Sequence, residues 1–204
     1  MIYKTILLRD IKLALAGATS FLNLALFFLI ATSLFVFASN DPDLIVKNSV
    51  AVIWACATLA ALIGLNEIYY NDYVSGHLEQ LFISGFSLEN IVIAKMLSYC
   101  LITCLPIMLV APLVIIMLQA DIWIMPYLFF GIMLLSIISS VCAALTLEVS
   151  KVRVIAELLL LPLFIPVIIF GTNKSLFMLL ALVLFMLPLC VIASKVALNS
   201  ALKS

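Results

Sequence analysis

Six long stretches of this 204-residue chain contain no Asp, Glu, Lys or Arg. These stretches cover residues 13–40, 48–66, 96–120, 122–147, 158–173 and 175–194. An α-helix needs about 20 mainly apolar residues to cross a bilayer core about 30 Å thick. Because the six stretches leave almost no chain for a water-soluble domain, the sequence predicts a single integral membrane domain over residues 1–204.

The apolar stretches are predicted to be helices rather than strands of a membrane barrel. Barrel strands alternate apolar and polar residues over about 10 positions, whereas the apolar runs here are continuous. We therefore predict an all-α, polytopic fold with six transmembrane helices, near residues 20–39, 49–66, 96–118, 127–147, 155–171 and 176–196. The chain is also formally neutral, which argues against the basic surface of a nucleic-acid-binding protein.

The distribution of basic residues predicts how these helices are oriented. Cytoplasmic loops of membrane proteins are enriched in Lys and Arg. If the N-terminus is cytoplasmic, Lys47 and Lys174 fall outside and the other basic residues fall inside: Lys4, Arg9, Lys12, Lys95, Lys151, Arg153, Lys195 and Lys203. Six crossings then place both termini in the cytoplasm.

The first 16 residues have two interpretations. On a helical wheel Ile2, Ile6 and Leu13 cluster, with Arg9 and Asp10 at the edges of the cluster. Such a segment could lie as an interfacial helix on the cytoplasmic membrane surface. It could equally be a charged extension of the first span.

The longest charged interruption, residues 67–95, lies on the predicted cytoplasmic side between the second and third spans. Within it Leu78, Leu81, Phe82 and Phe86 have the i, i+3, i+4, i+8 spacing of one helix face. Gly76 and Gly85 bound this short amphipathic helix, and glycine suits tight turns. Either the helix presents its polar side to a cytoplasmic partner, or it is an interfacial linker between two spans.

Residues of this segment resemble a signature of ABC-2-type exporter permeases. The matching positions are Glu67, then Gly76, His77, Leu78, Glu79, Gln80 and Leu81, then Lys95. Further short motifs make the chain similar to the cytochrome c maturation protein B (CcmB) family, also called haem exporter protein B: Leu105-Pro106, Ala111-Pro112-Leu113, Leu161-Pro162-Leu163 and Ile165-Pro166.

This resemblance implies a type V exporter-like permease of the bacterial inner membrane or, as the alternative, the mitochondrial inner membrane. Residues 67 and 76–81 would form the coupling surface that docks on a separate ABC ATPase subunit. The other implied partners are a haem-handling membrane subunit, a small single-span subunit and a second copy of this chain. The complex would load haem onto a periplasmic chaperone, and the resemblance leaves open whether the permease moves haem or releases the loaded chaperone.

Other candidate sites are weaker. A second cytoplasmic contact with the ATPase is predicted at Glu148, Lys151, Arg153 and Glu157, although Glu157 could simply pair with Arg153 four residues earlier. His77 is the only histidine, and haem iron commonly takes a His ligand. Because His77 falls on the predicted cytoplasmic helix, we interpret it as a surface contact.

No catalytic residue, metal site or resident cofactor is predicted. Haem would be a ligand that the complex transports or that a partner holds. The chain lacks G-x-x-x-x-G-K-[ST], the loop that cradles nucleotide phosphates, so ATP hydrolysis would belong to a partner. Two other functions stay open. One is an ABC-2-type exporter of a lipid, glycan or drug, and the other is a non-transport membrane scaffold for a haem lyase.

Overall fold

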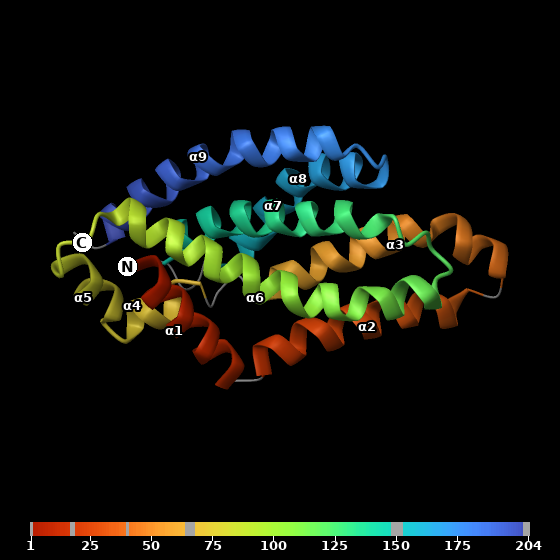
Figure 1. The fold of residues 1–204 in the computed structure, drawn as a ribbon, viewed down its shortest axis with the longest axis horizontal. Helices are drawn as coiled ribbons and strands as arrows, with labels where there is room; N and C mark the ends of the chain where they lie inside the picture. The colour runs from red at the N-terminus through yellow and green to blue at the C-terminus, as the bar shows by residue number, and fades with distance from the viewer. Residues whose placement is uncertain (1, 17–18, 40, 64–67, 148–152, 202–204) are drawn as a thin grey trace.

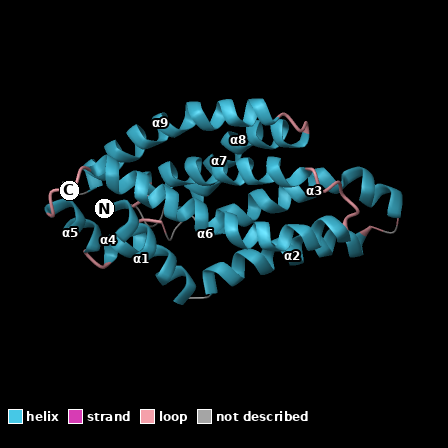
Figure 2. Cartoon of the chain, in the orientation of Figure 1, coloured by secondary structure: helices cyan, strands magenta, loops and turns pink. Residues whose placement is uncertain are grey.

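The computed structural model describes residues 2–16, 19–39, 41–63, 68–147 and 153–201. Within these residues the regular structure is entirely helical (Figure 2). The helices in chain order are α1 (Ile2–Ala16), α2 (Thr19–Ala38), α3 (Pro42–Ile63), α4 (Tyr70–Val74), α5 (His77–Ile83), α6 (Leu88–Met117), α7 (Ile124–Leu145), α8 (Arg153–Thr172) and α9 (Leu176–Ala201).

Five helices within the described residues are long and apolar enough to cross a membrane. They are Phe21–Ala38 of α2 and the whole of α3, α6, α7 and α9. Helix α8 coincides with the predicted fifth span and contains Pro162 and Pro166, but its described apolar part is the shorter stretch Leu161–Thr172. The polytopic all-helical fold is therefore confirmed, and the sixth crossing remains a prediction.

Helix α6 begins earlier than the sequence predicts. Its 30 residues start at Leu88 rather than near residue 96. A helix of this length extends about 45 Å, which exceeds the thickness of a bilayer core. The first turns of α6, including Lys95, therefore belong to the same helix as the apolar run.

Helix α7 forms the centre of the bundle. In its most apolar window 67% of residues are buried, against 22% in α9 and 17% in α2. Small side chains are buried along it: Ser136, Ser139, Ser140, Ala143 and Ala144. Small residues let membrane helices approach closely, so this face of α7 packs against other helices of the same chain.

A single tryptophan fills the space between three helices. Trp54 of α3 is fully buried. A Cβ atom placed on Gly131 of α7 or on Gly171 of α8 would overlap its indole ring. The two glycines therefore provide the surfaces against which the ring packs.

The connections gather at two ends of the bundle. Figure 1 shows α4, α5, the start of α1 and the end of α9 at one end, and the end of α2 with the α6–α7 and α8–α9 turns at the other. At this second end Lys174 binds Asp121 across the two turns, with 2.9 Å between Nζ and Oδ2. Lys47 and Lys174, the two basic residues predicted outside, thus lie away from the α4–α5 end.

Candidate functional site

Helices α4 and α5 form a compact unit at one end of the bundle (Figure 1). Both glycines that were predicted to bound the short helix adopt positive φ, 71° at Gly76 and 81° at Gly85. Only glycine adopts such angles without strain from a Cβ atom. The sharp turns that separate α5 from α4 and from α6 therefore depend on backbone conformations that glycine readily adopts.

The α5 helix is two-faced, but its faces differ in part from the prediction. Leu78 is fully buried, and Leu81 and Phe86 pack partly buried against the core. Phe82 was predicted on this packed face, yet it is 39% exposed, and Ile83 is 81% exposed. A helix of seven residues buries one narrow stripe, and the Leu78–Leu81 pair at i, i+3 occupies it.

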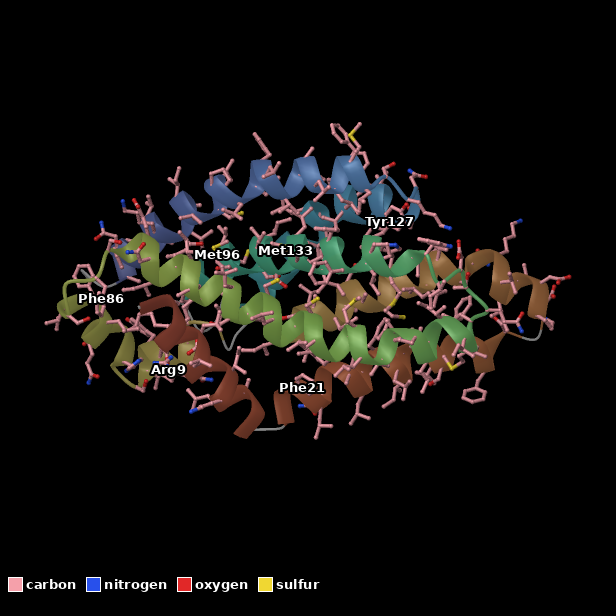
Figure 3. All side chains as sticks on the ribbon, in the orientation of Figure 1. Arg9, Phe21, Phe86, Met96, Tyr127 and Met133 are labelled. Atoms are coloured by element: carbon pink, nitrogen blue, oxygen red, sulfur yellow. The ribbon has the colours of Figure 1, made fainter. Side chains whose placement is uncertain are left out.

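The exposed side of the unit mixes apolar and polar side chains. We call these residues the α5 outer surface: Val74, Glu79, Gln80, Phe82 and Ile83. Large apolar side chains that are rimmed by polar ones are typical of sites that contact a protein, a membrane or a ligand. In Figure 3 side chains project outward at the end of the bundle where Phe86 is labelled.

The base of the unit is held by a buried tyrosine. Tyr69, directly before α4, is fully buried, and its hydroxyl lies 2.9 Å from the Ser140 hydroxyl of α7. Burial raises the pKa of Tyr69 above its usual value, so the phenol stays neutral. Nearby, the Tyr99 hydroxyl of α6 donates a 2.8 Å hydrogen bond to the Ala61 carbonyl of α3. The buried hydroxyl groups of Tyr69 and Tyr99 thus hold the segment between α3 and α6 against the bundle.

Four charged side chains from three helices form a closed arrangement beside α4. We call it the charge ring: Arg9 and Asp10 of α1, Asp72 of α4 and Lys95 of α6. Arg9 Nη2 lies 2.7 Å from Asp10 Oδ1 and 2.5 Å from Asp72 Oδ2. Lys95 Nζ lies 3.0 Å from Asp10 Oδ2 and also binds Asp72 Oδ2. Each acid therefore contacts each base.

The ring is largely removed from solvent. The side chains of Lys95, Asp10 and Asp72 are 6%, 9% and 12% exposed, and that of Arg9 is 26% exposed. Burial disfavours the charged carboxylate of Asp72, but Lys95 and Arg9 outweigh this effect and hold its pKa below the usual value. Burial lowers the pKa of Arg9, but the hydrogen bond to Asp72 and the charges of Asp10 and Asp72 outweigh burial and raise it. Both groups are therefore charged at neutral pH.

The lowered pKa of Asp72 predicts how stability depends on pH. A carboxylate whose pKa is depressed by folding stabilises the protein above its unfolded pKa, and this contribution disappears as pH falls through the folded value. Above about pH 5 the ionisation of Asp72 should therefore not change the melting temperature in detergent. As the pH falls below 3.8, the ordinary pKa of an aspartate, the melting temperature should decrease. Asp72→Asn should make this decrease in melting temperature at acid pH smaller. Asp43→Asn, at an exposed position of α3, should leave the decrease unchanged. An equal decrease in melting temperature at acid pH in the two variants would contradict a lowered pKa at Asp72.

The structure brings together some of the predicted site residues and not others. Residues 76–81 lie on or at the start of α5, and Lys95 lies in the charge ring. Glu67, Glu148 and Lys151 lie outside the described residues. Arg153 and Glu157 belong to α8, but their side chains are outside the described part as well, so the second cytoplasmic contact remains a prediction.

Sequence reasoning missed Asp72 and misjudged α1. The wheel put Asp10 at the edge of the apolar cluster, yet among the described side chains of α1 Ile6 and Asp10 are the buried ones, and Leu13 is 58% exposed. Two features of the sequence could have indicated this contact. One is the i, i+4 spacing of Ile6 and Asp10, and the other is the position of Lys95 directly before the charge-free run 96–120. In Figure 1, α1 and α2 run in different directions, so α1 is not a straight extension of the first span.

The described side chains offer no group of three or more His, Cys, Asp or Glu that could hold a metal ion. The arrangement instead joins a projecting two-helix unit to the bundle through a buried hydroxyl contact and a ring of charges. These features define an all-helical, multi-pass type of membrane protein with a protruding helical segment between its second and third long helices.

Comparison with known proteins then places the chain more narrowly. The model of the CcmB protein family matches residues 1–200, and the chain belongs to this family. The chain is 33% identical to heme exporter protein B of Haemophilus influenzae over 178 residues, covering 85% of this chain and 80% of that protein. It is 30% identical to heme exporter protein B of Rhodobacter capsulatus and 31% identical to that of Pseudomonas aeruginosa, covering 83% and 84% of this chain and 80% and 79% of those proteins.

Proposed function

We propose that this chain is the permease subunit of an ABC transporter complex that acts in cytochrome c maturation. The name of its relatives, heme exporter protein B, supports a role in moving haem or in releasing a haem-loaded chaperone. Haem is transported or held by a partner in this proposal and is not a resident cofactor. ATP is hydrolysed by a separate subunit, and this chain is not itself an enzyme.

The α5 outer surface is the observation that carries this proposal. Ile83 and Val74 are 81% and 66% exposed at the end of the bundle where Arg9, Lys95 and Lys195 also lie. Exposed apolar side chains beside Glu79 and Gln80 suit a groove on a protein partner. Residues Gly76, His77, Leu78, Glu79, Gln80 and Leu81, with Glu67 before them, are the proposed ATPase-coupling segment. Glu148, Lys151, Arg153 and Glu157 are a proposed second contact.

The proposal includes a topology and an assembly. The chain is one permease domain with six crossings, α8 being the fifth, and with both termini in the cytoplasm of a bacterium whose inner membrane holds it. Helix α1 lies at the cytoplasmic interface. The chain forms a homodimer with two ATPase subunits, and it works with a haem-handling membrane subunit and a small single-span subunit.

Ile83→Asp is expected to reduce recovery of the ATPase subunit with this chain at least tenfold, because a carboxylate would then have to be buried unpaired in the partner's groove. The measurement is co-purification from native membranes together with the yield of holocytochrome c. Ile122→Asp is the control, since Ile122 is also exposed but lies in the turn before α7 at the opposite end.

Full ATPase recovery and normal cytochrome yield with Ile83→Asp would contradict the proposed coupling surface. If an ATPase co-purifies but the membranes make normal c-type cytochromes without this chain, the protein is an exporter of another substrate. If no ATPase co-purifies with the unaltered chain, the scaffold function replaces the permease.

A further inference from the structure

The charge ring distributes its members unequally among the helices. Helix α1 contributes one base and one acid, α4 contributes only Asp72, and α6 contributes only Lys95. The α4–α5 unit is therefore tied by one carboxylate to two different elements. The Arg9–Asp72 contact leads to α1, and the Lys95–Asp72 contact leads to α6.

The two elements differ in how firmly the bundle holds them. Helix α6 is a long helix with 14 buried residues, and the Tyr99 hydrogen bond ties it to α3. In the part of α1 whose side chains are described, Ile6 and Asp10 are buried while Leu8 and Leu13 are 44% and 58% exposed. Helix α1 therefore packs mainly along α6, and the Arg9–Asp72 pair links it to α4.

We propose that the Arg9–Asp72 pair is the joint through which a displacement of α4 and α5 reaches α1 and, through it, the first long helix α2. This inference rests on the proposed function, in which the ATPase moves α5. Arg9 and Asp72 are positioning residues that act through the helices that carry them. Asp72 contacts the partly exposed guanidinium of Arg9 on α1 and the buried ammonium of Lys95 on α6, so a movement of α4 would change both contacts.

Two double variants remove one acid and one base each, so neither leaves a net charge in the ring. The joint-cut variant, R9Q/D72N, keeps the Asp10–Lys95 pair and so keeps α1 on α6. The joint-kept variant, D10N/K95Q, keeps the Arg9–Asp72 pair and so keeps α4 on α1. Both variants lose the Arg9–Asp10 and Lys95–Asp72 contacts, so they differ in which pair remains: Asp10–Lys95 in the joint-cut variant and Arg9–Asp72 in the joint-kept variant.

The first readout is hydrogen exchange of the backbone amides of residues 70–74 in the purified chain. We expect exchange at least tenfold faster in the joint-cut variant and within about twofold of the unaltered chain in the joint-kept variant. The second readout is the ratio of holocytochrome c formed to ATP hydrolysed in the reconstituted complex. We expect this ratio to fall at least tenfold in the joint-cut variant alone, with ATPase association retained.

Equal exchange and equal coupling ratios in the two variants, or a larger loss in the joint-kept variant, would overturn the joint. If both variants fail to fold, the ring acts as one structural unit and the joint is also overturned. If the unaltered chain binds no ATPase, the proposed function fails, while the exchange comparison still decides whether Arg9 holds α4.

Discussion

Replacing Lys95 with methionine is expected to lower the free energy of unfolding of this protein by about 3–5 kcal/mol, the cost of removing one partner from a buried ion pair. Methionine has a similar length but carries no charge. Asp10 and Asp72, whose side chains are 9% and 12% exposed, would then share the single cation of Arg9. The measurement is thermal or denaturant unfolding in detergent, followed by circular dichroism.

Lys195→Met is the matched control for this variant. Lys195 also lies at the α4–α5 end and also binds a carboxylate, with 2.7 Å between its Nζ and Glu89 Oε1. Because these two side chains are 44% and 55% exposed, losing the pair should cost no more than about 1 kcal/mol. Equal costs for the two lysines would show that the charge ring is no more important than a surface pair.

Trp54→Ala is expected to cost about 3–5 kcal/mol, the usual range for deleting a buried aromatic side chain. The cost depends on how well neighbours can fill the space that the ring leaves. Here two of the facing surfaces are Gly131 and Gly171, which have no side chains to move into it. Helices α7 and α8 would have to shift as whole bodies, so we expect a cost near the upper end of the range.

The control for this variant is Trp123→Ala, because Trp123 is the only other tryptophan and is 72% exposed. It should change the melting temperature little. A complementary variant, Gly131→Ala, should also destabilise the protein, since its methyl group would overlap the Trp54 ring. Combining Gly131→Ala with Trp54→Phe should recover part of the loss. A stable Trp54→Ala protein would show that the ring fills no essential space.

The long helices could be predicted because bilayer thickness imposes a length on an apolar run. Charge-free stretches in the sequence coincide with α2, α3, α6, α7, α8 and α9. The predicted spans begin too late at α3 and α6, which start at Pro42 and Leu88 rather than near residues 49 and 96, because the prediction followed the charge-free runs alone. Lys95 and Glu89 are charged but helical, and the helix simply continues past the membrane core.

The charge ring could not be predicted because its members are far apart in the chain and individually ordinary. Counting Lys and Arg on each side of the membrane treats Lys95 and Arg9 as solvated charges, whereas the fold buries them against Asp10 and Asp72. Likewise, the helical wheel of α1 had no information about which neighbour the helix would meet. Its inward face is set by Ile6 together with Asp10, the acid that pairs with Lys95.

The most direct test of this account is a covalent contact from α5 to the ATPase subunit in intact membranes. A photo-reactive benzoylphenylalanine would replace Ile83, and in a matched chain Ile116, an equally large side chain that is 77% exposed near the other end of α6. Irradiation followed by mass spectrometry should give an adduct with the ATPase subunit from position 83 and none from position 116. An adduct from position 116, or only lipid attached at position 83, would contradict the assignment of α5 as the coupling helix.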